Sequence, residues 1–457
     1  MAEEVDIVVV GMGPGGEDAA SRLAGAGLDV VAVESRLVGG ECPYFACIPT
    51  KMMVRAADSL AEARRVPVLA GHSAVRPDWT PVADRVRDEA TTDWNDDAAV
   101  RRFEATGGRL VRGTGRITAP GEVTVSGSAG TLVFRARRGI VLNPGSEPVI
   151  PPIDGLDGTP YWTNRDAVAA TQLPDSLLVL GGGPVGLEFA QVFARFGASV
   201  AIVEMSDRLL RPTEPEAAAV LTEVLRGEGV DVRTGEGVDS VEHTGGRFRL
   251  RLNSGTAVAG ERLLVATGRR TDLAALGVGA VGLDESARSV PVDERMRAAD
   301  GVWAIGDVTG RGAFTHTSIY QSRIAAADIL GLDAEAADYR AMPAVTFTDP
   351  EVATVGLTEE RARAQGVDVR TACVDLPSAP RGWIHKAGND GLVKLVADAR
   401  RATLVGATVV APLGGEVLGA LAVAVHAEVP VETLRGMIYA YPTFHRTIEA
   451  ALAALDV

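Results

Sequence analysis

The feature that most constrains this chain is a glycine-rich motif that occurs twice. In the first copy, the β-branched run Ile7–Val10 leads into Gly11-Met-Gly-Pro-Gly-Gly16, a helical stretch at 18–25 and a second run, Val30–Val33, that ends in Glu34. Strand, G-x-G-x-x-G turn, helix and strand together form a dinucleotide-binding pattern. The glycines allow a tight turn, close approach of the backbone to a pyrophosphate, and close helix packing. The terminal acid is placed to accept hydrogen bonds from ribose hydroxyls. The candidate cofactor contacts in this copy are Gly11, Gly13, Pro14, Gly15, Gly16 and Glu34.

The second copy repeats this order. Leu177–Leu180 is the strand, Gly181-Gly-Gly-Pro-Val-Gly186 is the turn, and Ala201–Glu204 ends the second strand. The first glycine and the terminal acid are 23 positions apart in both copies, from 11 to 34 and from 181 to 204. One such motif is a weak signal, but two with the same offset predict two dinucleotide sites, a resident flavin and a visiting nicotinamide. The candidate contacts in this copy are Gly181, Gly183, Gly186 and Glu204.

Three further segments are predicted to be strands that end in a glycine turn: Ile140–Ser146, Leu263–Gly268 and Val302–Asp307. Nucleotides bind at the carboxyl ends of strands in open α/β sheets. The acid that ends the last segment is placed to bond a ribityl hydroxyl. The candidate cofactor contacts from these strand ends are Gly145, Gly268, Gly306 and Asp307.

The length and net charge of the chain limit the classes of function that it can have. A chain of 457 residues is expected to form two to four domains. Its net charge of −15 argues against nonspecific binding to nucleic acid or anionic lipid. We find neither an apolar run long enough to span a bilayer nor a basic, apolar secretory start. We therefore expect a cytoplasmic protein that does not bind membranes or nucleic acid.

The chain has three cysteines, of which two lie close together. Such a low, odd count does not make a disulfide scaffold. Cys42 and Cys47 indicate either metal binding or redox chemistry, and zinc would need a second Cys or His pair nearby. The sequence offers no such pair, so we expect redox chemistry and no metal site. Cys373, in the alternating stretch 370–376, is expected to be a half-buried strand residue.

The spacing of Cys42 and Cys47 limits how they can pair. Residues five apart in a regular helix are about 8.6 Å apart at Cα, whereas a disulfide needs roughly 4.4–6.8 Å. The pair can bridge only if the turn is distorted. Pro43 suits a first helical position and Pro49 is expected to disrupt the next turn. A helix N-terminus would lower the pKa of Cys42, and the alternative is two buried thiols that never pair.

The stretch Gly39–Lys51, which reads GGECPYFACIPTK, resembles the redox centre of the class I pyridine nucleotide–disulfide oxidoreductases. This family includes dihydrolipoamide dehydrogenase, glutathione reductase and mercuric reductase. The glycine turns and the late segment Phe347–Leu357 extend the resemblance over nearly the whole chain. The implied fold is α/β, with two Rossmann-like dinucleotide-binding domains and a C-terminal α+β dimerisation domain. The implied boundaries are 1–150 and 270–340 for FAD, 151–269 for NAD(P), and 341–457 for the homodimer interface.

The resemblance also implies roles. Cys47 would face the flavin C4a as the charge-transfer thiolate, and Cys42 would attack the acceptor as the interchange thiol. Lys51 would sit near flavin N5 and pair with Glu188, because a cation there stabilises the negative charge of a reduced flavin. Gly40, just before the redox pair, would contact the FAD.

The chain departs from the family where the acceptor binds. Tyr441 replaces the acid/base His before Pro-Thr, and Arg446 replaces the Glu that orients it. Mercuric reductase also has a Tyr here but adds a C-terminal cysteine pair, which this sequence does not show. His445 and Glu449, four apart on a helix expected to run from Pro442, are either a displaced acid/base pair or a solvated surface pair.

The sequence therefore predicts an FAD-dependent NAD(P)H oxidoreductase that passes electrons through Cys42 and Cys47 to a disulfide or dithiol. The alternative acceptor is a metal ion, such as mercuric ion, or a quinone; a flavin-bearing binding subunit without turnover is a third possibility. Glu204 favours NADH over NADPH, because a carboxylate repels a 2′-phosphate. The homodimer would share its site, with Tyr441 reaching the partner's Cys42 and the Tyr441–Pro442 bond cis.

Overall fold

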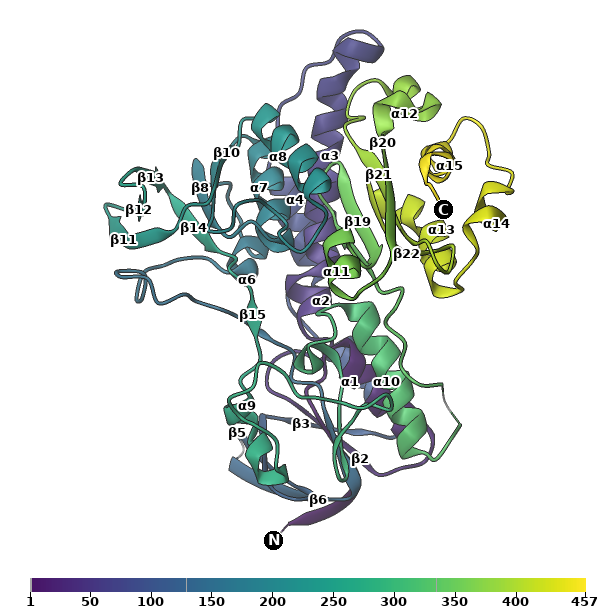
Figure 1. Ribbon diagram of the computed structural model, residues 1–457. Helices are drawn as coiled ribbons and strands as arrows, with labels where there is room; N and C mark the ends of the chain where they lie inside the picture. The colour runs from purple at the N-terminus through teal and green to yellow at the C-terminus, as the bar shows by residue number, and fades with distance from the viewer. Residues whose placement is uncertain (1, 129, 334) are drawn as a thin grey trace. The chain divides into compact units, whose positions relative to one another are not determined.

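The computed structural model describes residues 2–128, 130–333 and 335–457 (Figure 1). The chain divides into two compact units. The first comprises Met1–Pro49, Arg85–Val149 and Arg269–Asp338, and the second comprises Thr50–Asp84, Ile150–Gly268 and Tyr339–Val457. Among the described residues, no helix combines the length and apolar character needed to cross a membrane.

The first unit is built on an eight-stranded sheet with the order β16-β17-β6-β1-β2-β3, to which β5 and β4 are joined through β6. β1 and β2 are parallel and largely buried, as their valine-rich sequences predict. Figure 1 shows α10 beside α1. The strands are β1 (Glu3–Val10), β2 (Val30–Glu34), β3 (Arg109–Arg112), β4 (Thr114–Ala119), β5 (Glu122–Gly127), β6 (Gly130–Leu142), β16 (Arg297–Ala299) and β17 (Val302–Ala304).

Short helices connect these strands. Helix α1 begins at Pro14, four residues before the expected start, because Pro14 suits a first helical position and Gly16 lies inside the first turn. The helical segments of this part of the chain are α1 (Pro14–Gly25), α2 (Glu41–Phe45), the π-helix η1 (Val86–Ala90), α5 (Asp97–Glu104), α9 (Leu273–Leu276), η2 (Val278–Val281), η3 (Gly306–Thr309) and α10 (Thr315–Ile329). The two-residue strands β7 (Glu147–Pro148) and β15 (Arg269–Arg270) pair with each other.

The second unit contains a four-stranded parallel sheet of order β10-β9-β8-β14 and a three-stranded antiparallel sheet, β11-β12-β13. Helix α7 follows β8 through the second glycine turn, as the motif predicts. These elements are β8 (Ser176–Leu180), β9 (Ser199–Glu204), β10 (Asp231–Thr234), β11 (Val238–Thr244), β12 (Arg247–Leu252), β13 (Ala257–Gly260), β14 (Arg262–Val265), α6 (Asn164–Val168), α7 (Pro184–Phe196) and α8 (Pro215–Gly227). Helix α3 (Cys47–Leu69) starts at the unit boundary, and α4 (Thr80–Arg85) ends at it.

A five-stranded antiparallel sheet of order β18-β19-β22-β21-β20 completes the second unit. Alternating apolar residues of its strands pack against α13 and α15 in one core. These elements are β18 (Pro343–Thr346), β19 (Glu351–Gly356), β20 (Val369–Asp375), β21 (Leu392–Asp398), β22 (Thr403–Ala411), α11 (Glu359–Ala364), η4 (Leu376–Ser378), α12 (Pro380–His385), α13 (Gly414–His426), α14 (Val431–Arg435) and α15 (His445–Ala454).

The predicted fold class is confirmed: the chain is α/β, with two Rossmann-like sheets and a C-terminal α+β part. One local prediction is wrong. Cys373 lies in a strand as expected, but it is exposed rather than half-buried. The reason is that its neighbours Ala372 and Val374 face the core, and successive strand residues point to opposite faces, so Cys373 lies on the outer face.

Candidate active site

The first glycine turn packs its backbone tightly on two sides. Gly11 has φ +94°, and a Cβ there would lie 2.2 Å from the Asn143 carbonyl oxygen. A Cβ on Gly16 would lie 2.0 Å from the Gly11 carbonyl oxygen. Gly13, at the N-cap of α1, has a roomier face, where the first atom met is Asn143 Nδ2 at 3.2 Å. The turn therefore presents bare backbone at a helix N-terminus, which suits a pyrophosphate.

Glu34 ends β2 beside this turn. Its carboxylate accepts hydrogen bonds from Met12 N at 2.8 Å and from Arg36 N at 2.7 Å. The side chain is thereby fixed at the strand end. A carboxylate can accept about four hydrogen bonds in all, so its remaining lone pairs fit the hydroxyls of a ribose.

The second turn repeats this arrangement. Glu204 accepts hydrogen bonds from Gly182 N and Ser206 N, both at 2.6 Å. A Cβ on Gly186 would lie 2.3 Å from the Gly181 carbonyl oxygen. A Cβ on Gly183 would meet no described atom within 4 Å, so the N-terminus of α7 faces open space. The two copies thus match in hydrogen bonding as well as in sequence, and both fit a dinucleotide.

The later strand ends also gather polar groups. Ser146 Oγ donates to Asp307 at 2.5 Å, and Arg269 Nε donates to Ser146 Oγ at 2.9 Å. Thr271 Oγ1 donates to the Gly145 carbonyl oxygen at 2.6 Å. Gly306 adopts φ +76° immediately before Asp307. In the second unit, Gly268 adopts φ +117° at the end of its strand–turn segment.

The two close cysteines lie on different helices. Cys42 is in the first turn of α2, and Cys47 is the first residue of α3. Between the helices, Ala46 adopts φ −138° and ψ −108°, so the backbone between the two cysteines departs from a regular helix. Cys47 Sγ lies 3.5 Å from Thr315 Oγ1. Both cysteines are half-buried, which leaves a path for a small reactant.

The expectation for Pro49 is wrong. It does not disrupt the turn after the cysteines, because α3 begins at Cys47 and continues to Leu69. Pro49 lies in the first turn of this helix, where a backbone N–H has no partner within the helix. The break that separates the cysteines is at Ala46 instead.

The expected pair of Lys51 and Glu188 is present. Lys51 Nζ lies 2.7 Å from Glu188 Oε2 and 4.6 Å from the centre of the Phe347 ring. Glu188 Oε1 accepts a hydrogen bond from Phe347 N at 2.9 Å. Glu188 is 7% exposed, whereas the Lys51 side chain is 34% exposed. The carboxylate is therefore fixed, and it orients an ammonium group that still reaches solvent.

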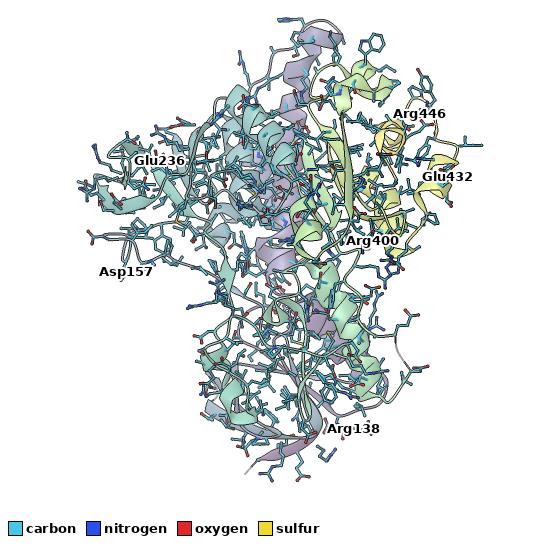
Figure 2. All side chains as sticks on the ribbon, in the orientation of Figure 1. Arg138, Asp157, Glu236, Arg400, Glu432 and Arg446 are labelled. Carbon is cyan, nitrogen blue, oxygen red and sulfur yellow. The ribbon has the colours of Figure 1, made fainter. Side chains whose placement is uncertain are left out.

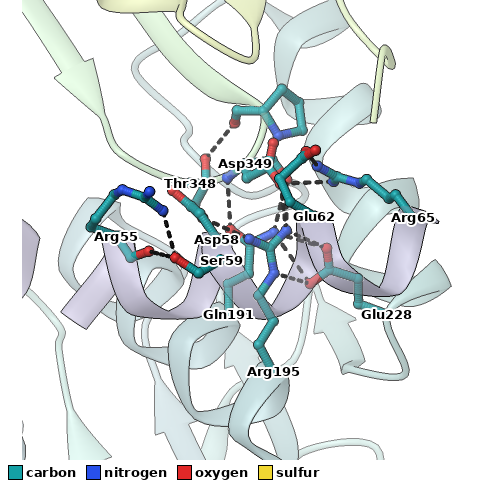
Figure 3. Close-up of polar contacts among 11 residues, drawn as sticks. Arg55, Asp58, Ser59, Glu62, Arg65, Gln191, Arg195, Glu228, Thr348 and Asp349 are labelled. Atoms are coloured by element: carbon teal, nitrogen blue, oxygen red, sulfur yellow. Dashed lines mark hydrogen bonds and ion pairs between the residues drawn. The ribbon is translucent and has the colours of Figure 1, made fainter. Parts of the chain in front are cut away.

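Two further polar residues share a face of α7 with Glu188, and sequence reasoning missed them. Gln191 donates to the Asp349 carbonyl oxygen at 2.9 Å and accepts from Asp349 N at 2.7 Å. Arg195 donates to the Asp349 carboxylate at 2.8 Å. Figure 3 shows these contacts converging on Asp349. The signal was the spacing of polar residues at 188, 191 and 195 in an otherwise apolar helix.

Arg195 is the centre of a buried ionic network. Its side chain is 2% exposed and pairs with Asp58 at 2.7 Å, Glu228 at 2.6 Å and Asp349 (Figure 3). Burial alone would lower the pKa of the guanidinium, but the ion pairs outweigh burial and raise it. Burial also raises the pKa of Asp58 to about 6, although Arg195 acts in the opposite direction. The network ties α3, α7 and the residues after β18 together within the second unit.

The C-terminal segment differs from expectation in one respect. The Tyr441–Pro442 bond is cis, as predicted, and the Tyr441 side chain is exposed. Helix α15, however, begins at His445 rather than at Pro442, because residues 440–444 form a turn in which Thr443 Oγ1 donates to the Ala440 carbonyl oxygen.

Arg446 projects from α15 (Figure 2) and pairs with Glu449 at 2.5 Å. Its guanidinium lies 5.7 Å from the centre of the Tyr441 ring. Glu449 therefore has a cationic partner in Arg446, on the same helix.

Comparison with known proteins agrees with this geometry. The family model described as pyridine nucleotide-disulphide oxidoreductase matches residues 5–322, and the model for its dimerisation domain matches residues 342–452. Dihydrolipoyl dehydrogenase 2 of Haloarcula marismortui is 33% identical, over 98% of this chain and 96% of that protein. A mercuric reductase of Streptomyces lividans is 32% identical, over 98% and 95%.

Solved structures show the same fold. The Cu(II) complex of RclA, a HOCl-induced flavoprotein disulfide reductase from Escherichia coli, has a TM-score of 0.87 at 26% identity, covering 99% of this chain and 100% of that chain. LpdA from Mycobacterium tuberculosis has a TM-score of 0.86 at 27% identity, covering 99% of both chains.

The chain belongs to the pyridine nucleotide-disulphide oxidoreductase family. It is an FAD-dependent enzyme that uses a pyridine nucleotide, and the matched dimerisation domain supports a homodimer. Its relatives include both dihydrolipoyl dehydrogenases and mercuric reductases. The family thus agrees with flavin-dependent disulfide reduction.

Proposed function

We propose that the chain carries electrons from NADH to Cys42 and Cys47, and that Cys42 delivers them to a small acceptor. The observation that carries the proposal is the helix break at Ala46, which leaves two half-buried cysteines at adjacent helix starts in the same unit as the first glycine turn. FAD, when bound, supplies a two-electron carrier between the nicotinamide and the cysteines. The first turn would hold its pyrophosphate, and Glu34 its ribose.

The thiol chemistry balances with a disulfide acceptor. The Cys42 thiolate would attack one acceptor sulfur, and the other sulfur would leave as a thiolate that takes up a proton. The Cys47 thiolate would then attack Cys42, release the second acceptor thiol and restore the Cys42–Cys47 disulfide. Lys51, oriented by Glu188, would stabilise negative charge on the reduced cofactor.

Tyr441 limits which acceptors suit this enzyme. The leaving thiolate must be protonated near neutral pH, and a phenol is a poorer general acid and base there than an imidazole. We therefore propose slow reduction of lipoamide and glutathione disulfide. Better acceptors would need no protonated leaving group, or would carry an acidic thiol.

Reduction of a metal ion or quinone is the second candidate function. The same Tyr441 favours it, and mercuric reductases are among the relatives. Because a quinone would take electrons without Cys42, the Cys42→Ser variant separates quinone reduction from disulfide reduction. With a disulfide acceptor, activity should be lost, whereas Cys373→Ser, the matched control on an exposed edge strand, should keep it. Full activity of Cys42→Ser with every accepted disulfide would refute the proposal.

We also propose NADH as the preferred donor. Glu204 ends β9 and is fixed by two backbone N–H groups, so its carboxylate would face the adenosine ribose and repel a 2′-phosphate. Arg208, the nearby cation that could soften this preference, instead donates to the carbonyl oxygens of Arg211 and Thr213.

The proposed organisation follows the family resemblance. Residues 1–150 and 270–340 would bind FAD, 151–269 NADH, and 341–457 the second subunit, in the cytoplasm. Exposed apolar side chains support a subunit interface in the last part: Ile438 is 99% exposed, Val423 65% and Leu413 56%. Tyr441, on the same segment as Ile438, would reach the partner's Cys42.

A further inference from the structure

We propose that Trp94 and Asp96 are positioning residues for the Cys42–Cys47 turn. The inference deepens the proposed function, because it concerns the same cysteines. It starts from an unusual backbone between η1 and α5, far from the glycine motifs in sequence.

Three successive non-glycine residues adopt left-handed backbone conformations in this turn. Thr92, Asp93 and Trp94 have φ of 50°, 54° and 54°. Each such residue is costly for an L-amino acid, and such strain concentrates at functional sites. The turn directly follows the π-helical residues Val86–Ala90, and Asp93 N donates back to the Arg87 carbonyl oxygen at 2.7 Å. Single-turn π segments are also frequent at functional sites.

Trp94, in this strained turn, contacts the segment between Cys42 and Cys47. Its ring stacks with Phe45, with centroids 6.4 Å apart and planes 25° apart. Phe45 is the last residue of α2 and directly precedes the break at Ala46. Trp94 Nε1 is buried without a hydrogen-bond partner among the described residues, so ring packing rather than a hydrogen bond holds the indole. Phe45 in turn lies 6.5 Å from the Tyr44 ring.

Asp96 holds the other end of the redox segment. Its carboxylate is buried, accepts from Val38 N at 2.6 Å and pairs with Arg112 at 2.5 Å. Val38 immediately precedes the glycines that lead into α2. Residues 94 and 96 therefore fix the segment on both sides of Cys42, at Val38 and at Phe45.

Such a brace favours the disulfide form. Oxidation requires the two sulfurs to stay within bonding distance, and the dithiol gains freedom if Phe45 loses its support. Replacing Trp94 should therefore make the Cys42–Cys47 disulfide easier to reduce. We expect a shift of about tenfold in the dithiol–disulfide equilibrium constant, which corresponds to about 30 mV.

The test equilibrates the FAD-bound enzyme with glutathione buffers of defined ratio and quantifies the Cys42 and Cys47 thiols by alkylation and mass spectrometry. Trp94→Leu should shift the equilibrium about tenfold, and Trp94→Phe, which keeps a ring, should restore most of it. Trp79→Leu is the matched control: Trp79 is buried and stacks on Phe193 at 5.0 Å in the other unit. An unchanged equilibrium in Trp94→Leu, or an equal shift in Trp79→Leu, would overturn the inference.

Phe45→Leu provides a second route if Trp94→Leu does not fold. It should produce the same shift, and the double variant should shift no further than either single one. Additive shifts would show that the two rings act independently and would overturn the inference. The proposed function has its own readout, since it fails if Cys42→Ser keeps activity with disulfides.

Discussion

Replacing Arg195 with Met should destabilise the second unit by about 3–5 kcal/mol. The Arg195 side chain is 2% exposed, and its removal would leave the carboxylates of Asp58, Glu228 and Asp349 without their shared cation. The Asp349 side chain is itself only 10% exposed, and after the change it would keep Arg65, at 2.7 Å, whereas Asp58 and Glu228 would lose the cation that pairs with them. Breaking a buried pair from one side costs more than the pair contributes, because an uncompensated charge remains.

The free energy of unfolding is measured by urea unfolding of the FAD-bound enzyme. Hydrogen–deuterium exchange of the folded enzyme is measured separately, for peptides from α7 and from residues 346–350. Exchange should rise in both peptides, because Arg195 and Gln191 hold Asp349 from side chain and backbone. Arg226→Met is the control, since that side chain is 48% exposed and pairs only weakly with Glu223 at the surface; its expected cost is below about 1 kcal/mol.

Removing the stranded charge should recover part of the loss. The double variant Arg195→Met/Asp58→Asn is expected to be more stable than Arg195→Met alone, because Asp58 pairs with Arg195 and a neutral amide is easier to bury than a carboxylate. If Arg195→Met lowers the free energy of unfolding no more than Arg226→Met does, the Arg195 ion pairs do not stabilise the second unit. If Asp58→Asn lowers the stability of the Arg195→Met variant further, the uncompensated charge is not the source of the loss.

Three further outcomes are expected. Burial raises the pKa of Asp58 from 3.8 to about 6, so its contribution to stability is full below pH 3.8 and is lost as pH rises through 6. Asp58→Asn should therefore flatten the plot of Tm against pH between these values, and an unchanged slope of that plot would contradict the raised pKa of Asp58. Tyr441→His should raise turnover of lipoamide or glutathione disulfide by on the order of 10²-fold; no gain in steady-state rates would mean that the missing base was never limiting. kcat/KM for NADH should exceed that for NADPH by on the order of tenfold because of Glu204, whereas comparable values would exclude that role.

Sequence alone predicted what depends on local pattern. The glycine turns and their terminal acids, Glu34 and Glu204, follow from a fixed spacing that the backbone of a strand–turn–helix unit demands. The pair of Lys51 and Glu188 came from family resemblance, because 137 residues separate them. Pro49 was misjudged because its effect depends on where the helix starts, which the break at Ala46 decides.

The spatial partners of other site residues could not be predicted from the sequence. Arg195 and Asp349 are 154 positions apart, and a charged residue in a helix pattern usually indicates a solvated face. The left-handed backbone at Trp94 could not be predicted from the sequence, because non-glycine residues rarely adopt this conformation. Its stacking on Phe45 depends on tertiary packing that overrides local preference.

The central claim is that electrons from the nicotinamide reach Cys42 and Cys47. The most direct measurement mixes the FAD-bound enzyme anaerobically with one equivalent of NADH, alkylates it and maps the labelled cysteines by mass spectrometry. We predict that oxidation of NADH is matched by new labelling of Cys42 and Cys47, while Cys373, exposed on β20, is labelled equally with and without NADH. Oxidation of NADH with no new label on either Cys42 or Cys47 would contradict the account.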